Sequence, residues 1–265
     1  MNKWNELPIQ IEGNWGASQA ADVQAVLKSC LLAVTTRLAL NDNLAPSSLR
    51  VIGEPERGYP MIWARDTEDQ SATTILCSID HQWAQLAYQF GHELGHIICN
   101  SWRAPAAKIE GPSHWLEEAL VEAFSVNNLV WMAEDWAAKP PYPNWASYSP
   151  NLSNYAKERI DQCRATEHAN LFECKPSLWF ESQAEHLNNA TTLTVNILPI
   201  VPWLVDEFSS DRELLSNLVA LNTWPERGRC SLSDYIDKWR TSCLEMRIAD
   251  ALPNMIGNKL GLTIY

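Results

Sequence analysis

The sequence feature that most constrains this chain is a pair of histidines four residues apart, His92 and His96, with Glu93 directly after the first. On a helix, two positions at this spacing differ in direction by about 40°, so both imidazoles can reach one metal ion. Glu93 is rotated by about 100° from His92 around the axis, which aims its carboxylate toward the water on such an ion. The pattern predicts a helix that carries two metal ligands and a general base.

A catalytic zinc ion needs a third protein ligand and an open position for water. The segment 112–125, which reads PSHWLEEALVEAFS, offers Glu117, Glu118 and Glu122 on one predicted helix. Glu118 and Glu122 share a helix face, whereas Glu117 is turned by about 100° from Glu118. Two carboxylates on one face suit one metal ligand and one partner that orients a ligating histidine. Without the histidine motif, the same glutamates would indicate a solvated helix face.

The two segments together resemble the gluzincin zinc metallopeptidases, particularly the small bacterial proteins called peptidase MA-like. The glutamate helix of that family reads like P-x-W-L-x-E-G-L-A-E, and the segment that starts at Pro112 follows a similar pattern. Matched by position, the resemblance implies one zinc ion bound by His92, His96 and Glu118. It also implies that Glu93 is the general base and that Glu122 orients a ligating histidine.

Two positions depart from the family pattern. Ala119 stands where the family usually has a glycine, a small change that a helix tolerates. Many gluzincins also place a tyrosine or histidine downstream to stabilise the tetrahedral oxyanion, but residues 189–196 read NATTLTVN. The substitutes for this role elsewhere in the chain are His168, His186, Tyr148 and Tyr155. A lone histidine or tyrosine can equally have a surface or packing role.

Hydrophobic periodicity predicts an α+β fold. Apolar residues at helical spacing predict helices over 17–40, 81–99 and 114–135, and Asp80 is the expected N-cap of the second. Runs rich in β-branched or aromatic residues predict strands over 49–53, 59–65 and 72–79. The resemblance implies a zincin-like fold, in which this small mixed sheet lies over the motif helix and the glutamate helix. The run 72–79 is the candidate edge for pairing with an extended peptide.

A proline-rich stretch over 138–150 marks the clearest internal boundary. Beyond it the chain is predicted to be mostly helical, with helices near 152–166, 199–208, 211–221 and 231–246. The segment 231–240 resembles the last helical motif of gluzincins. We therefore expect a catalytic lobe over 1–138 and a helical C-terminal subdomain over 139–265.

Charge and hydropathy limit the classes of binding partner and the cellular location that we expect. The formal charge of −12, from 32 acidic and 20 basic residues, argues against a nucleic-acid backbone or an anionic membrane surface as a partner. The N-terminus has no apolar core of signal-peptide length, and no stretch reaches the roughly 18 apolar residues of a membrane span. We expect a cytoplasmic protein, or one exported without a cleaved signal.

Cysteines and tryptophans are assigned to the core. Seven cysteines without CxxC spacing indicate reduced thiols rather than a disulfide such as Cys163–Cys174 or Cys230–Cys243. Cys99, three residues after the second motif histidine, is expected to pack in the core rather than bind metal. The 13 tryptophans are scattered, which favours core packing over a carbohydrate-binding surface.

The expected activity is hydrolysis of a peptide or protein substrate. Two alternatives remain open: a zinc-binding or regulatory protein that hydrolyses nothing, motivated by the missing oxyanion donor, and a peptidase toxin or effector. The histidine motif also resembles cytosolic proteases that cleave phage-type repressors, but their E-x-x-A-N-like glutamate helix matches Trp115-Leu-Glu-Glu less well. The sequence leaves the cleaved bond, endo- or exopeptidase action and the oligomeric state undetermined.

Overall fold

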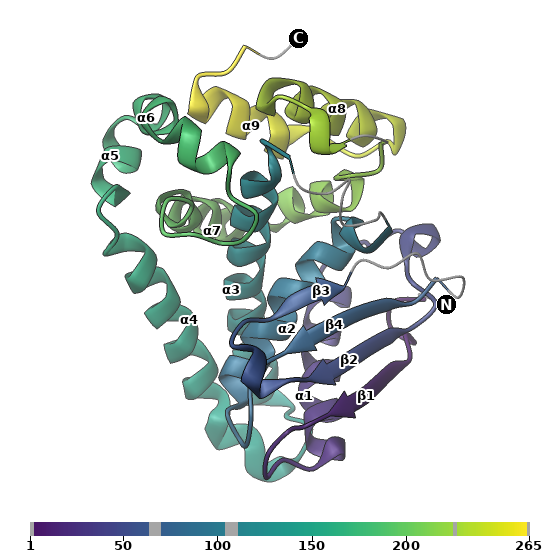
Figure 1. Ribbon diagram of the computed structural model, residues 1–265. Coiled ribbons are helices and arrows are strands. Elements are labelled where there is room, and N and C mark those ends of the chain that lie inside the picture. Colours follow the sequence, from purple (N-terminus) through teal and green to yellow (C-terminus); the bar gives the residue numbers. More distant parts are fainter. Residues whose placement is uncertain (1–2, 64–69, 104–110, 225–226, 264–265) are drawn as a thin grey trace.

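The computed structural model describes residues 3–63, 70–103, 111–224 and 227–263. It is an α+β structure in which a small sheet lies beside a mostly helical body (Figure 1). The α+β class and the mixed character of the sheet are as predicted from the sequence.

The sheet has four strands: β1 (Ile9–Gly13), β2 (Leu49–Gly53), β3 (Met61–Trp63) and β4 (Ala72–Leu76). Their order is β1-β2-β4-β3, with β1, β2 and β4 parallel and β3 antiparallel to β4. Helix α1 (Ala20–Thr35) supplies the crossover that the parallel pair β1 and β2 requires. The short strand β3 therefore lies at one edge of the sheet.

The predicted strand over 49–53 is confirmed, and those over 59–65 and 72–79 are shorter than predicted. Residues 64–65 of the predicted second strand lie outside the described residues. The sequence reading missed β1, although its Ile-Gln-Ile-Glu alternation is typical of a half-buried strand. The expectation that 72–79 would offer a free edge was wrong, because β4 pairs with β2 on one side and with β3 on the other.

Helices α1 and α2 (Trp83–Ile98) pack against the sheet, and α3 (His114–Ala138) packs against both (Figure 1). All three were predicted, with ends that differ by a few residues. The predicted N-cap was wrong: α2 begins after Gln82 without a side-chain cap. Asp80 has a left-handed backbone with φ of 55°, and its carboxylate accepts the backbone N–H of Ala17 at 2.7 Å. Asp80 therefore links the residues just before α1 to the loop before α2.

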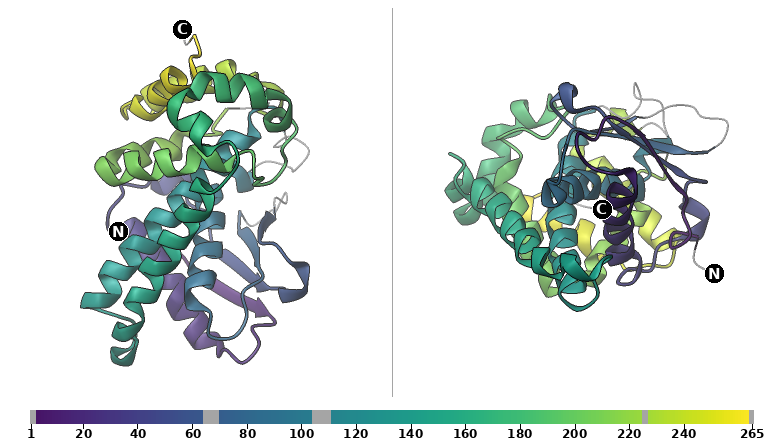
Figure 2. Two further views of the ribbon diagram at one scale, coloured as in Figure 1. Left: turned by 90° about the vertical axis from the view of Figure 1, so that its left-hand side faces the viewer. Right: turned by 90° about the horizontal axis from the view of Figure 1, so that it is seen from below.

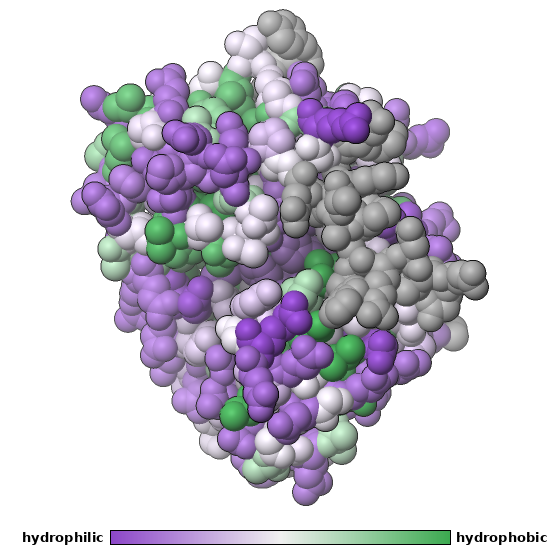
Figure 3. Space-filling model, viewed as in Figure 1, coloured by the Kyte–Doolittle hydropathy of each residue, from purple (hydrophilic) through white to green (hydrophobic). Residues whose placement is uncertain are grey.

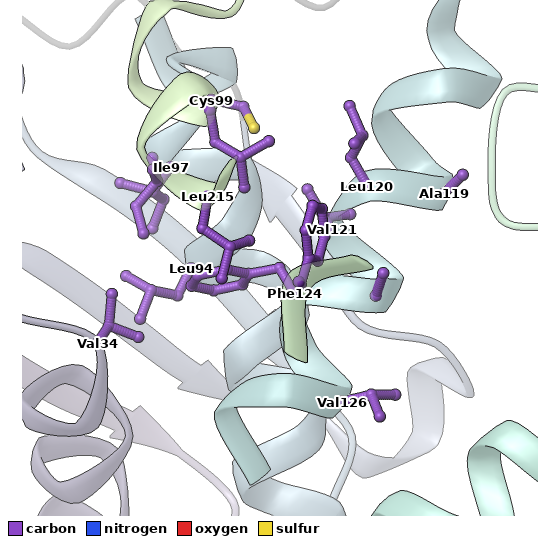
Figure 4. Packing of buried hydrophobic residues seen from close by; sticks show 14 of the residues in the cluster. Val34, Leu94, Ile97, Cys99, Ala119, Leu120, Val121, Phe124, Val126 and Leu215 are labelled. Carbon is purple, nitrogen blue, oxygen red and sulfur yellow. The ribbon is translucent and has the colours of Figure 1, made fainter. Parts of the chain in front are cut away.

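Two glycines bring α2 and α3 close together. A Cβ added at Gly95 would lie 2.9 Å from the Val121 Cβ and 3.2 Å from the Phe124 ring, and one at Gly91 would lie 3.0 Å from the Ser125 Oγ. Leu94 and Ile97 of α2 and Leu120 and Val121 of α3 belong to the packed core in Figure 4. The predicted core position of Cys99 is confirmed, since this side chain is fully buried.

The chain after α3 is helical, as predicted: α4 runs along α3, and the helices that follow α4 lie toward the end of the molecule remote from the sheet (Figure 2). The helices are α4 (Ser149–Arg164), α5 (Ala169–Cys174), α6 (Pro176–Asn188), α7 (Val201–Ser210), α8 (Leu232–Glu245) and α9 (Ala251–Leu260). The predicted helix over 211–221 is a 3₁₀ helix, η7 (Arg212–Ala220), and α5, α6 and α9 were not predicted.

The predicted boundary after residue 138 coincides with the end of α3. The division into 1–138 and 139–265 stays a prediction, and the hydrophobic core is continuous across that boundary. Helix α3 connects the two parts, because it packs against α1 and α2 and also against α4 and α7.

The cysteines and the tryptophans show how far the expectations drawn from composition hold. All seven cysteines lie in the described part of the chain, and no disulfide joins them, as expected; five are buried, but the core assignment was wrong for Cys77, which is partly exposed, and for Cys174, which is exposed. The tryptophans Trp115, Trp136, Trp179 and Trp239 are fully buried, in agreement with a core role. Within the described ranges, no helix is both long enough and apolar enough to cross a membrane.

Candidate metal centre

The two motif histidines and Glu118 meet at the interface of α2 and α3. Ligand atoms of His92, His96 and Glu118 all lie within 4.8 Å of one another, and the three side chains are buried. The His92 Nε2 lies 3.4 Å from Oε2 of Glu118, and the His96 Nε2 lies 3.4 Å from Oε1 of the same carboxylate. The structure thus brings together the three residues that we predict to be metal ligands.

Glu122 contacts the other ring nitrogen of His92. Its Oε2 lies 3.2 Å from the His92 Nδ1, and the Tyr88 hydroxyl donates to both carboxylate oxygens at 2.6 Å. Arg159 of α4 donates to Oε1 of Glu122 at 3.1 Å, which neutralises a carboxylate that is fully buried. The geometry is that of a carboxylate fixing the orientation and tautomer of a ligating histidine.

Glu117 orients His96 in the same way, a role that was not predicted from the sequence. Its Oε1 lies 2.7 Å from the His96 Nδ1, and the Ser101 hydroxyl donates to that same oxygen. Its Oε2 accepts the side-chain N–H of Asn222 at 2.8 Å, and Asn222 in turn accepts the Tyr235 hydroxyl at 2.7 Å. The rotation of Glu117 away from Glu118 was the available signal, because it places this carboxylate on the other histidine.

Hydrogen bonds from two asparagines link the end of α2 to the end of η7. Asn100 donates its side-chain amide to the carbonyls of Val219 and Leu221 at 3.0 and 2.9 Å. Asn222 donates to the carbonyl of Cys99 at 3.0 Å. Both asparagines have left-handed backbones, with φ of 64° and 59°, which asparagine adopts more readily than most residues. The C-terminal helices are therefore linked directly to the helix that carries the histidines.

Glu93 lies on α2 beside the three candidate ligands. It is buried, its Oε2 has no hydrogen-bond partner among the described residues, and the backbone of Ile62 in β3 hydrogen-bonds the carboxylate. Burial raises the pKa of Glu93 to about 7, although the nearby His92 and His96 oppose the shift. A carboxylate with a pKa near neutrality can take and return a proton at neutral pH.

His114 is a second residue at the site that the sequence reading missed. It is the first residue of α3, four positions before Glu118, and its Nε2 lies 3.2 Å from the Glu118 Oε1. The available signal was this spacing of four, which places both side chains on one helix face.

A cavity of about 890 Å³ opens onto these residues. Its walls come from α2, α3, α4, β3 and the loop at residues 191–193. Figure 3 shows the surface hollowed near the centre of the view, above β3. A substrate in this cavity would lie directly against Glu93 and the candidate ligands.

Of the four proposed oxyanion donors, only Tyr155 lines this cavity. Tyr148 instead accepts the backbone N–H of Ala84 at 3.2 Å, near the start of α2. His168 precedes α5, and His186 is exposed on α6. The loop in which no tyrosine was found does reach the cavity, through Thr191, Thr192 and Leu193.

The donor set suits a zinc ion. Two imidazoles and one carboxylate are ligands that zinc commonly takes in catalytic sites. Each Nδ1 is held by its own carboxylate, so both Nε2 atoms are directed at Glu118. Burial alone would raise the pKa of Glu118, but the three neighbouring histidines hold it well below its usual range. Glu118 is therefore ionised at neutral pH, as a metal ligand must be.

The chain was compared with protein-family models, with curated proteins and with solved structures, and none of the three comparisons found a match.

Proposed function

We propose that this protein is a zinc-dependent peptidase of zincin-like fold, in which His92, His96 and Glu118 hold the metal. The observation that carries this proposal is the group of three ligand atoms within 4.8 Å, at the base of a cavity and beside the buried Glu93. Bound zinc would supply Lewis acidity, polarising the scissile carbonyl and acidifying the attacking water.

Glu93 is the general base in this proposal. Its Oε2, which has no hydrogen-bond partner in the described part of the chain, can accept a proton from the attacking water. The carboxylate can then pass that proton to the leaving amine. The hydrogen bond from the Ile62 backbone fixes the carboxylate while the proton is held. Glu117 and Glu122 keep the two imidazoles oriented throughout.

The cavity also offers groups that could hold the peptide. Strand β3 is the edge of the sheet and supplies Met61 and Ile62 to the cavity wall. An extended substrate could add to this edge through backbone hydrogen bonds. Tyr155, on the α4 side, is the candidate donor to the developing oxyanion.

The position of Tyr155 favours hydrolysis over the alternative of a zinc-binding protein without activity. That alternative rested on the missing oxyanion donor in residues 189–196. Tyr155 stands in the cavity wall, and burial raises its pKa, so its hydroxyl is protonated and able to donate at neutral pH. A role as a toxin or effector is compatible with the same site and concerns only the choice of substrate.

The first experiment is the metal content of purified protein, measured by elemental analysis for wild type, Glu118→Ala and Glu122→Ala. We expect about one zinc per chain, lost in Glu118→Ala but only weakened in Glu122→Ala, because the second carboxylate acts through His92. Absence of zinc from wild-type protein, even after incubation with it, would refute the proposal.

The second experiment separates metal binding from hydrolysis. Wild type and Glu93→Gln are incubated with a broad peptide library, and cleavage is followed by mass spectrometry. We expect Glu93→Gln to keep its zinc and to lose cleavage. Zinc binding without cleavage by wild type would favour the non-hydrolytic alternative, and full activity of Glu93→Gln would exclude Glu93 as the base.

A further inference from the structure

His114 lies against the proposed zinc ligand Glu118 but outside the metal-binding group itself. That group consists of His92, His96 and Glu118, whose ligand atoms are within 4.8 Å of one another, and His114 does not belong to it. Its Nε2 is instead 3.2 Å from the Glu118 Oε1, and its ring lies parallel to that of His96 at 6.4 Å. The placement fits a partner of a ligand better than a fourth ligand.

The surroundings of the ring decide which nitrogen of His114 carries the proton. The Nδ1 atom is buried and has no hydrogen-bond partner among the described residues. A buried N–H without an acceptor is rarer in folded proteins than an under-satisfied acceptor. The tautomer protonated at Nε2 is therefore favoured, and it donates this N–H to Glu118.

We propose that His114 is a positioning residue that holds Oε1 of Glu118 and so restricts this ligand to one oxygen toward the metal. The inference rests on the proposed function, because it requires zinc at the site. A carboxylate that binds zinc through both oxygens fills a further coordination position, whereas a one-oxygen ligand leaves that position open for water and substrate. His114 would thus keep the metal accessible.

Helix α3 then supplies one orienting partner for every proposed ligand. Glu122 contacts His92, Glu117 contacts His96, and His114 contacts Glu118. Positions 114, 118 and 122 follow one another at the spacing of four that places side chains on one helix face. This shared face carries the third ligand and two of the three partners, whereas Glu117, turned by about 100° from Glu118, reaches His96 from the neighbouring face.

The test uses the full-length protein and compares His114→Phe, which removes the donor, with His114→Gln, whose amide can replace it. Zinc dissociation constants are measured by chelator competition, and coordination is followed by the visible absorption of the cobalt-substituted protein. We expect zinc affinity about 10-fold weaker in His114→Phe, with a cobalt spectrum shifted toward higher coordination number. His114→Gln should restore both readouts toward wild type.

His186→Phe is the matched control, because this histidine is exposed on α6 and does not line the cavity. Melting temperatures of the chelator-treated proteins show whether each variant folds. If His114→Phe does not fold, His114→Asn takes its place, since its shorter amide cannot reach the carboxylate. Wild-type affinity and spectrum in the variant without the donor would overturn the inference, as would equal losses in His114→Gln. Failure of wild type to bind zinc would instead overturn the proposed function.

Discussion

Asn222 donates its side-chain amide to the Glu117 carboxylate at 2.8 Å, although 105 residues separate the two in the sequence. Through Glu117 this contact reaches His96, because the other carboxylate oxygen lies 2.7 Å from the His96 Nδ1. The C-terminal helices thereby take part in orienting a proposed zinc ligand, in addition to covering α3.

The first prediction concerns this contact. Asn222→Gly removes the amide but suits the left-handed backbone, so it tests the hydrogen bonds without added strain. We expect zinc affinity about 10-fold weaker, and stability lower by about 1.5–3 kcal/mol because a hydrogen bond to a charged group is lost. Chelator competition and urea denaturation measure the two effects.

Asn100→Gly is its matched control. Asn100 also has a left-handed backbone and also links the end of α2 to the end of η7, but among the described residues its amide contacts only the carbonyls of Val219 and Leu221. This variant should lose stability and keep the zinc affinity of the folded protein. Equal losses of zinc affinity in both variants would show that Asn222 acts only through general stability.

The second prediction concerns the close approach of α2 and α3. Gly95→Ala would place a Cβ 2.9 Å from the Val121 Cβ, so one helix must move. We expect a loss of about 1–3 kcal/mol from overpacking, measured by denaturation, together with weaker zinc binding. Gly91→Ala should be milder, because its nearest contact is the Ser125 hydroxyl at 3.0 Å, which can rotate away at the cost of its hydrogen bond to the Tyr88 carbonyl. A larger effect at Gly91 would contradict this account of the interface.

The third prediction follows from the pKa of Glu93, which is raised from 4.5 to about 7 chiefly by burial. Between these pH values the folded protein keeps a proton that the unfolded chain releases, so the free energy of unfolding falls as pH rises. At about 1.4 kcal/mol per pKa unit, the loss is on the order of 3 kcal/mol. Chelator-treated Glu93→Gln should therefore be more stable than wild type at pH 8, with little difference at pH 5. A difference independent of pH, in urea denaturation, would count against the shifted pKa.

The fourth prediction tests Tyr155 as the oxyanion donor and rests on the proposed function. Tyr155→Phe should lower kcat by about 10²-fold, the cost of removing one such donor, with little change in KM. Tyr148→Phe is the control, because that hydroxyl contacts the Ala84 backbone away from the cavity. Kinetics on a peptide that wild type cleaves would measure both, and unchanged kcat in Tyr155→Phe would exclude this role.

Much of the first half of the fold follows from local sequence patterns. Helix α2, which carries His92, could be predicted because its apolar residues recur at a period close to 3.6, and α3, which carries Glu118, because a strongly helical segment begins just after Pro112. The central strand β2 could be predicted from its β-branched and apolar run. Strand β1 and helix α5 were missed because they are short, and α6 and α9 because packing does more than local propensity to stabilise them.

The sequence by itself determined the chemical groups of the candidate site: two imidazoles and a carboxylate at fixed helical spacing, and a second helix with paired carboxylates. The tertiary structure decided which further side chains contact these groups or line the cavity beside them. Glu117, His114 and Tyr155 gained their positions from the approach of α2, α3 and α4, and Asn222 reached Glu117 from the far end of the chain. The physical reason is that helical spacing fixes directions within one helix, whereas contacts between helices depend on how their buried faces pack.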